Sequence, residues 1–142
     1  MNLSDLLKDD RLRKIEPDLQ QAKDCVTAAE RDIKAAKSML ETDCDWAFSI
    51  AYSAALQSAR ALMFSDGFRA AGEDSHKVAV EFADVKLGAK MRDAMDFFGR
   101  MRLKRHQAVY EKSGAISRFE AEHAIKTAEE ILAKVKEKIK AL

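Results

Sequence analysis

Apolar residues recur every three or four positions over two long stretches of this chain, which is the spacing of one buried face of an α-helix. The first stretch begins near Pro17, which suits the first turn of a helix because no backbone donor is lost there. The second follows Ser117 and Glu120, whose spacing forms a capping box and predicts a helix start near residue 118. The two sets of apolar positions are Leu19, Ala22, Val26, Ala29, Ile33, Ala36 and Leu40, and Ala121, Ile125, Ala128, Leu132, Val135, Ile139 and Leu142. We therefore expect two long amphipathic helices.

The segment between these two stretches contains a third, unusually apolar helix over residues 43–66. Arg60 is its only charged residue between Trp46 and Ser65, and Gly67 follows as the expected C-terminal stop. A helix that is apolar on most of its circumference is normally buried among others. Its serines and glutamine are too many polar groups for a membrane span. We therefore expect this helix to be the central element of the domain.

Three further helices complete the expected architecture. One runs over residues 75–87 with Val78, Phe82 and Val85 inward, one over about residues 90–110, and a short one lies within the first fifteen residues. Pro and Gly together make up 6 of the 142 residues, too few for the frequent turns of an all-β domain. We predict an all-α fold, an up-and-down bundle of four to five helices in a single domain over residues 1–142, with its core at about 17–141. A coiled-coil rod is the alternative, which the glycine-punctuated middle of the chain disfavours.

The charges cancel almost completely, with 25 basic against 24 acidic residues and a net charge of +1. This balance argues against a whole-molecule affinity for nucleic acid or an anionic membrane, but it permits local patches. The start of the chain lacks the basic and apolar regions of a signal peptide, and the two cysteines cannot form a disulfide framework. We expect a cytoplasmic protein without a membrane partner.

Most catalytic signatures are absent from the sequence. It has no glycine-rich phosphate loop, no nucleophile elbow and no metal-binding pair of the CxxC or HExxH type. His76, His106 and His123 are far apart and lack ligand spacing. We expect neither a metal site nor a cofactor.

The helix near residues 90–110 breaks the pattern with a basic stretch. Residues 100–106 place five potentially cationic groups in seven positions, and Arg105 falls on the apolar face. An arginine there must find an anion, a partner carboxylate or a subunit interface, because an unpaired buried charge is very costly. Arg102, His106 and Tyr110 follow at i, i+4 and i+8 on one side of the helix, whereas Arg100 continues the polar face.

The apolar central helix carries a matching polar stripe that ends in Arg60. The other members of this stripe are Asp45, Ser49, Ser53 and Gln57. They are mostly small and uncharged, which suits the close approach of another helix or a polar groove. Arg60 is then either an anion-binding group or the partner of a buried carboxylate. Tyr52 lies on a different side and is expected in the core.

The sequence resembles the HEPN domain (higher eukaryotes and prokaryotes nucleotide-binding) in two places. The first is residues 46–62 with their continuation through Gly67 to Ser75 and His76, and the second is the basic run 102–110. The resemblance covers about residues 17–141. It implies a bundle of four to five helices that commonly forms a homodimer, often encoded beside a small nucleotidyltransferase as toxin and antitoxin. Active members of the family are metal-independent ribonucleases that use an arginine, four to six intervening residues and a histidine.

The resemblance allows two registers for this motif. Arg100 and His106 have the required spacing, but they lie about 120° apart around an ideal helix. In the other register, Arg105 is the arginine and Tyr110 takes the place of the histidine. We prefer the second register because it uses the arginine that periodicity leaves unexplained. Tyrosine has an ordinary pKa near 10 and is a poor base at neutral pH, so this register favours binding over catalysis.

Three functional hypotheses follow. The first is a dimeric module that binds a nucleotide, an RNA phosphate or a partner protein and acts with a small nucleotidyltransferase. The second is an active metal-independent endoribonuclease with His106 as its catalytic residue. The third is a structural or adaptor bundle without a ligand. The expected anion- or nucleotide-binding residues are Arg102, Arg105, Tyr110, Arg60 and Arg100.

Overall fold

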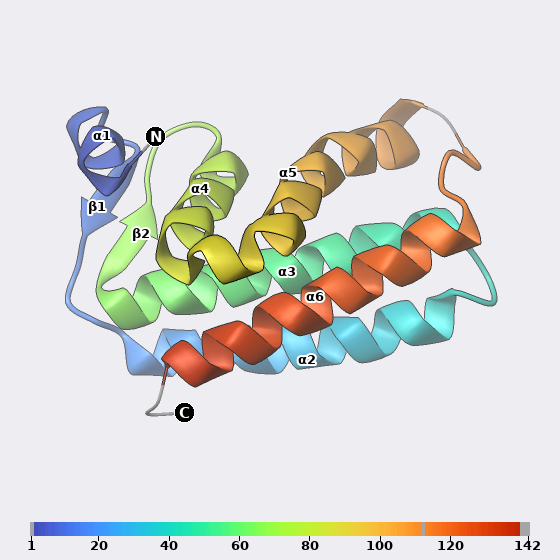
Figure 1. Cartoon of the computed structure of the whole chain (residues 1–142), viewed down its shortest axis with the longest axis horizontal. Helices are drawn as coiled ribbons and strands as arrows, with labels where there is room; N and C mark the ends of the chain where they lie inside the picture. The colour runs from blue at the N-terminus through green and yellow to red at the C-terminus, as the bar shows by residue number, and fades with distance from the viewer. Residues whose placement is uncertain (1, 112, 140–142) are drawn as a thin grey trace.

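The computed structural model describes residues 2–111 and 113–139 and confirms the all-α prediction (Figure 1). The helices are α1 (Leu3–Lys8), α2 (Leu19–Met39), α3 (Cys44–Asp66), α4 (Ser75–Leu87), α5 (Arg92–His106) and α6 (Arg118–Lys138). A single turn of 3₁₀-helix (Ala89–Met91) precedes α5, and a π-helical segment (Gln107–Glu111) follows it. Leu142, the last position of the second apolar stretch, and the final residues of the expected domain lie outside the described part.

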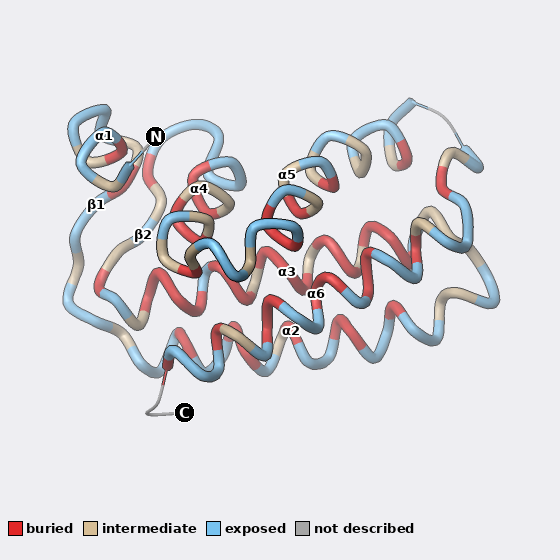
Figure 2. The backbone as a smooth tube through the Cα atoms, in the orientation of Figure 1, coloured by how far each residue is buried: buried red, intermediate tan, exposed pale blue. Residues whose placement is uncertain are grey.

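Helix α3 is the centre of the bundle, as its composition predicts. It lies between α2 and α6 on one side and α4 and α5 on the other (Figure 1). Its backbone is buried along most of its length, whereas the outer faces of its neighbours are exposed (Figure 2). Phe48 and Tyr52 are its largest fully buried side chains. No helix within residues 2–111 and 113–139 combines the length and hydropathy that a membrane span needs.

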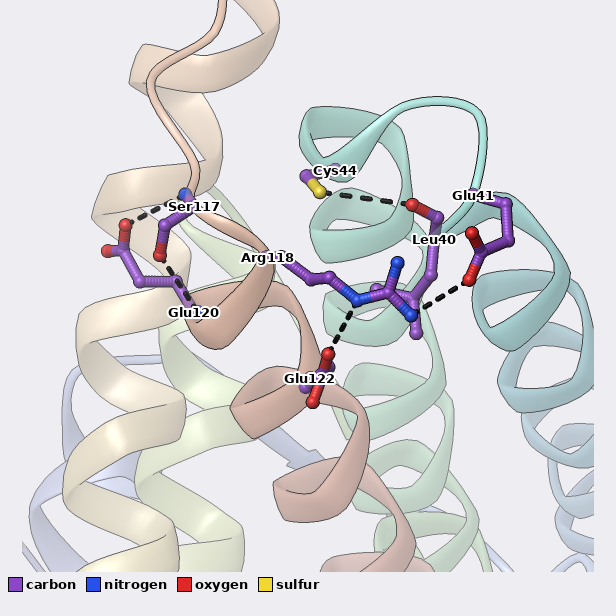
Figure 3. A network of polar contacts seen from close by, with 7 residues as sticks. All are labelled: Leu40, Glu41, Cys44, Ser117, Arg118, Glu120 and Glu122. Atoms are coloured by element: carbon purple, nitrogen blue, oxygen red, sulfur yellow. Dashed lines mark hydrogen bonds and ion pairs between the residues drawn. The ribbon is translucent and has the colours of Figure 1, made fainter.

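Side chains and backbone close the helix ends at the positions that the sequence indicates. Ser117 and Glu120 form the predicted capping box of α6. Arg118 then bridges two elements, because its guanidinium lies 2.8 Å from a carboxylate oxygen of Glu41 and 2.7 Å from one of Glu122 (Figure 3). The start of α6 is thereby tied to the turn between α2 and α3.

A two-stranded antiparallel sheet, which the sequence analysis does not predict, joins the N-terminal region to the end of α3. Strand β1 (Leu12–Lys14) pairs with β2 (Phe68–Ala70), with Leu12 opposite Ala70. Next to it, the Ile15 N–H donates to the Gly67 carbonyl at 2.9 Å. Strands of three residues are too short for a period-2 pattern, so only the tertiary pairing reveals them.

Several element boundaries differ from the predicted ones. Pro17 lies before α2 rather than in its first turn, because the Asp18 side chain caps the helix by accepting from the Gln21 N–H at 3.0 Å. Val85 is exposed, and Leu87 takes the inward position at the end of α4. The expected helix over residues 90–110 is α-helical only from Arg92 to His106.

Candidate functional site

The basic side chains of α5 divide between two sides of the helix. Arg102, Arg105 and His106 line a groove with the first turn of α4. Arg100 lies instead over the ring of Phe97, at 5.7 Å from its centroid, and lines a different hollow. Lys104 is also outside the groove, because its Nζ lies 2.8 Å from a carboxylate oxygen of Glu120. The structure therefore separates Arg100 and Lys104 from Arg102, Arg105 and His106.

Arg105 is half-buried between α5 and α3, at the position where the sequence places an arginine on the apolar face. Its Nε donates to the Ser49 hydroxyl at 3.3 Å, and its guanidinium lies 5.4 Å from the centroid of the Tyr52 ring. Across residues 2–111 and 113–139, no carboxylate lies within ion-pair distance of Arg105. A serine and an aromatic face thus hold this cation without neutralising its charge.

Two further members of the polar stripe of α3, Ser53 and Asp45, make contacts between elements. The Ser53 hydroxyl donates to Asp32 of α2 at 2.9 Å. Asp45 accepts from the Gly114 and Ile116 N–H groups at 2.7 and 3.0 Å. These bonds fasten α2 and the loop before α6 to the central helix.

Tyr52 is a core residue, as predicted, but its polar end reaches the edge of the groove. Its hydroxyl lies 3.2 Å from Nδ1 of His76. Burial raises the pKa of Tyr52 to about 12, although Arg105 and Arg102 act in the opposite direction. The hydroxyl therefore stays protonated at neutral pH and fixes the ring of His76.

His76, in the first turn of α4, is the residue on which the cations converge. His76 is exposed to solvent on one side. Partial desolvation and the positive charges of three arginines lower its pKa below the ordinary value, so that its imidazole is mostly neutral at pH 7. The three arginines are Arg105, Arg60 and Arg102. The spacing of His76 from the other histidines gives no sign of a site, and in the sequence only the resemblance around Ser75 and His76 points to it.

The groove between α4 and α5 has a volume of about 550 Å³. Its lining is Asp74, Ser75, His76 and Lys77 on one side, and Arg102, Leu103, Arg105, His106, Gln107 and Glu111 on the other. Asp74 makes no side-chain hydrogen bond to the start of α4, so the N–H groups of that turn have no such cap. Guanidinium groups and an uncapped helix N-terminus are both ligands that a phosphate prefers.

Tyr110 departs from the side of the helix that the spacing assigns to it. The backbone changes from α- to π-helix at Gln107, which shifts the register of every later side chain. Tyr110 is 67% exposed and lines a separate pocket with Asp45 and Trp46, although its ring centroid lies 5.1 Å from that of His106. Neither register of the motif therefore has both members on the groove.

His106 is exposed and lines the groove together with Arg102, four residues earlier. Its Nε2 lies 3.6 Å from a carboxylate oxygen of Glu111. The imidazole is thus accessible to a ligand held by the arginines. Within the described residues, no three His, Cys, Asp or Glu side chains gather as metal ligands would.

Arg60 lies at a second pocket of about 380 Å³, which adjoins the groove through shared lining by Ser75 and His76. The Arg60 side chain is exposed, and its guanidinium lies over the ring of Phe64 at 5.7 Å from the centroid. No ion pair joins Arg60 to a carboxylate in the part of the chain that the structure describes. The alternative of a buried carboxylate partner for Arg60 is therefore wrong.

Comparisons with known proteins agree with this architecture. A family model, that of the HEPN domain, matches residues 22–138. Among solved structures, TT1696 from Thermus thermophilus superposes with a TM-score of 0.66 at 23% sequence identity, over 83% of this chain and 98% of that chain. At 23% identity, this likeness shows that the two chains share a fold. No curated protein matches the chain.

Proposed function

Because the chain belongs to the HEPN domain family, we propose that it is a helical module that binds the phosphate of a nucleotide or an RNA in the groove between α4 and α5. The observation that carries this proposal is that Arg102 and Arg105 line the groove together with His76, and Arg60 lines the adjoining pocket together with the same residue. None of the three has a carboxylate partner within the described residues. Converging guanidinium groups that no carboxylate neutralises favour a multivalent anion.

The two carboxylates that line the groove do not cancel this charge. The groove lining contains three cationic side chains, Lys77, Arg102 and Arg105, and two carboxylates, Asp74 and Glu111. Glu111 also lies beside His106. The groove thus keeps an excess of positive charge, although the chain as a whole is nearly neutral. This local excess supports phosphate binding without a general affinity for nucleic acid.

Substitution of Arg102 or Arg105 by alanine should weaken the binding of pyrophosphate and of labelled single-stranded RNA by about tenfold or more, since hydrogen bonds to charged groups contribute about 1.5–3 kcal/mol. Arg100→Ala removes the same charge from the same helix but on the other side, and should change affinity by less than about twofold. Calorimetry and fluorescence anisotropy at one fixed salt concentration measure these affinities.

The same variants separate binding from a purely structural role. If Arg105 binds phosphate, Arg105→Ala should lower the free energy of unfolding by only about 1 kcal/mol, through the loss of its contacts with Ser49 and Tyr52. Equal affinities for all three variants, together with a large loss of stability for Arg105→Ala, would support the structural or adaptor bundle instead.

A metal-independent ribonuclease is the second candidate function, because His106 lines the same groove as Arg102 and Arg105. In that reaction the arginines hold the scissile phosphate, and the imidazole moves a proton at the 2′-hydroxyl or the leaving oxygen. Cleavage of labelled single-stranded RNA in the presence of EDTA, lost in His106→Ala, would establish it. Equal cleavage by both proteins, or cleavage by neither, removes His106 from catalysis.

We further propose that the chain forms a homodimer with α5 at or near the subunit boundary. Leu103 and Tyr110 support this arrangement, because they are 63% and 67% exposed beside the basic stretch. A monomeric mass by light scattering at micromolar concentration would count against it. Action together with a small nucleotidyltransferase, as toxin and antitoxin, stays a prediction that co-purification of the two proteins tests.

A further inference from the structure

The second pocket, at the junction of α3, β2 and α4, combines an apolar wall with positive charge. Leu56, Met63, Phe64 and Ala79 supply the apolar wall of this 380 Å³ pocket. Arg60 and Arg69 line it as well, and among its described lining residues there is no aspartate or glutamate. A pocket of this kind suits an anionic ligand with an apolar or aromatic body, and its volume lies in the range of small-molecule sites.

This pocket and the α4–α5 groove meet at His76. Ser75 and His76 line both cavities, and the Tyr52 hydroxyl holds His76 from the core side. Arg60 in the pocket and Arg105 in the groove act electrostatically on the same imidazole. The two cavities are therefore neighbours that share the wall formed by Ser75 and His76.

We infer that the pocket receives the base of a nucleoside phosphate whose phosphate group lies in the α4–α5 groove. The guanidinium of Arg60 already lies over the Phe64 ring, and a planar guanidinium is a surface on which nucleobases stack. The side chains of Gln21 and Ser75 also line the pocket. The Gln21 amide nitrogen donates to Asp18 at 3.0 Å, so its carbonyl oxygen and the Ser75 hydroxyl are the groups available to the edges of a base. This inference rests on the proposed phosphate binding and adds where the base of the ligand lies.

Ribose 5-phosphate and the four nucleoside 5′-monophosphates test the inference, because they share a sugar phosphate and differ in the base. We expect at least one nucleotide to bind the wild-type chain about tenfold more tightly than ribose 5-phosphate, since the stacking of one base contributes a factor of this order. The inference is overturned if none of the four binds more tightly than ribose 5-phosphate.

A blocking variant locates the base. Gln21 is exposed on α2 and lines the pocket, so Gln21→Trp fills the pocket without altering the core. Gln20→Trp places the same side chain on the neighbouring exposed position, outside the pocket lining, and is the matched control. We expect Gln21→Trp alone to remove the tenfold advantage of the nucleotide, with binding of ribose 5-phosphate unchanged. Equal losses in the two variants would overturn the inference.

The outcomes also distinguish this inference from the function on which it rests. If ribose 5-phosphate binds and Arg102→Ala abolishes its binding, the groove holds phosphate whatever the pocket does. If the wild-type chain binds neither ribose 5-phosphate nor any nucleotide, the proposed function and the inference both fail. A short single-stranded oligoribonucleotide, measured beside the mononucleotides, shows whether the pocket also takes a base of a strand. Its affinity falls in Gln21→Trp together with that of the mononucleotides if a strand uses the pocket, and it is unchanged if the pocket takes the base of a free nucleotide alone.

Discussion

Replacement of Phe98 by alanine should lower the free energy of unfolding by about 3–5 kcal/mol, the usual loss for a fully buried phenylalanine. Phe98 is completely buried on the inner face of α5, and its ring centroid lies 5.7 Å from that of Tyr52. Truncation leaves a cavity between α5 and α3 and removes support from the residue that holds His76. We therefore expect the stability loss, measured by urea denaturation, to be accompanied by weaker phosphate binding.

Phe119→Ala is the matched control, because the same side chain is removed from a residue that is 77% exposed on α6. Its effect on the free energy of unfolding should stay within about 0.5 kcal/mol. Phe98→Leu, which keeps much of the volume, should cost less than Phe98→Ala. If Phe98→Ala and Phe119→Ala destabilise the protein equally, the packing of α5 on α3 described above is wrong.

Substitution of Gly67 by alanine is the second change with a large expected effect on stability. Gly67 ends α3 with a φ of +83°, and a Cβ there would lie 2.9 Å from the Ile15 carbonyl oxygen. The backbone cannot move away freely, because the Ile15 N–H donates to the Gly67 carbonyl at 2.9 Å. We expect a loss of about 2–4 kcal/mol, from the left-handed conformation and the steric clash together.

Gly114→Ala separates these two contributions. Gly114 also has a positive φ, of +77°, but a Cβ built there meets nothing within 4 Å. It should therefore cost only about 1–2 kcal/mol, the conformational part. Thermal and urea unfolding of the two variants provide the comparison. If both variants lose the same free energy of unfolding, the Ile15 carbonyl does not crowd a side chain at Gly67 as described here.

The helices could be predicted because their signals are local. Ser117 and Glu120 cap α6, Gly67 stops α3, and the near absence of charge in α3 identifies it as the central helix. Such patterns depend on residues within one or two turns of each other, which sequence spacing records directly. The short β1–β2 sheet pairs residues more than fifty positions apart, and nothing in either strand alone indicates it.

The candidate site could be predicted only in part. Periodicity identified Arg105 as the arginine that the apolar face does not explain, and it lies in the groove. The same reasoning could not exclude Arg100 from the site or foresee that the π-helical turn moves Tyr110 away from it. Nor could it relate His76 to Tyr52, which lie 24 residues apart on different helices.

The sequence by itself determined which segments are helical, which helix is central and which arginine lies on an apolar face. These properties follow from backbone periodicity and from contacts within a turn. The tertiary structure alone decided which cations share a groove, because that depends on how α4 and α5 pack against α3 and bring His76 beside Arg102 and Arg105. Arg60, Arg102 and Arg105 become neighbours of one imidazole only when the packing of separate helices places them in two cavities that His76 also lines.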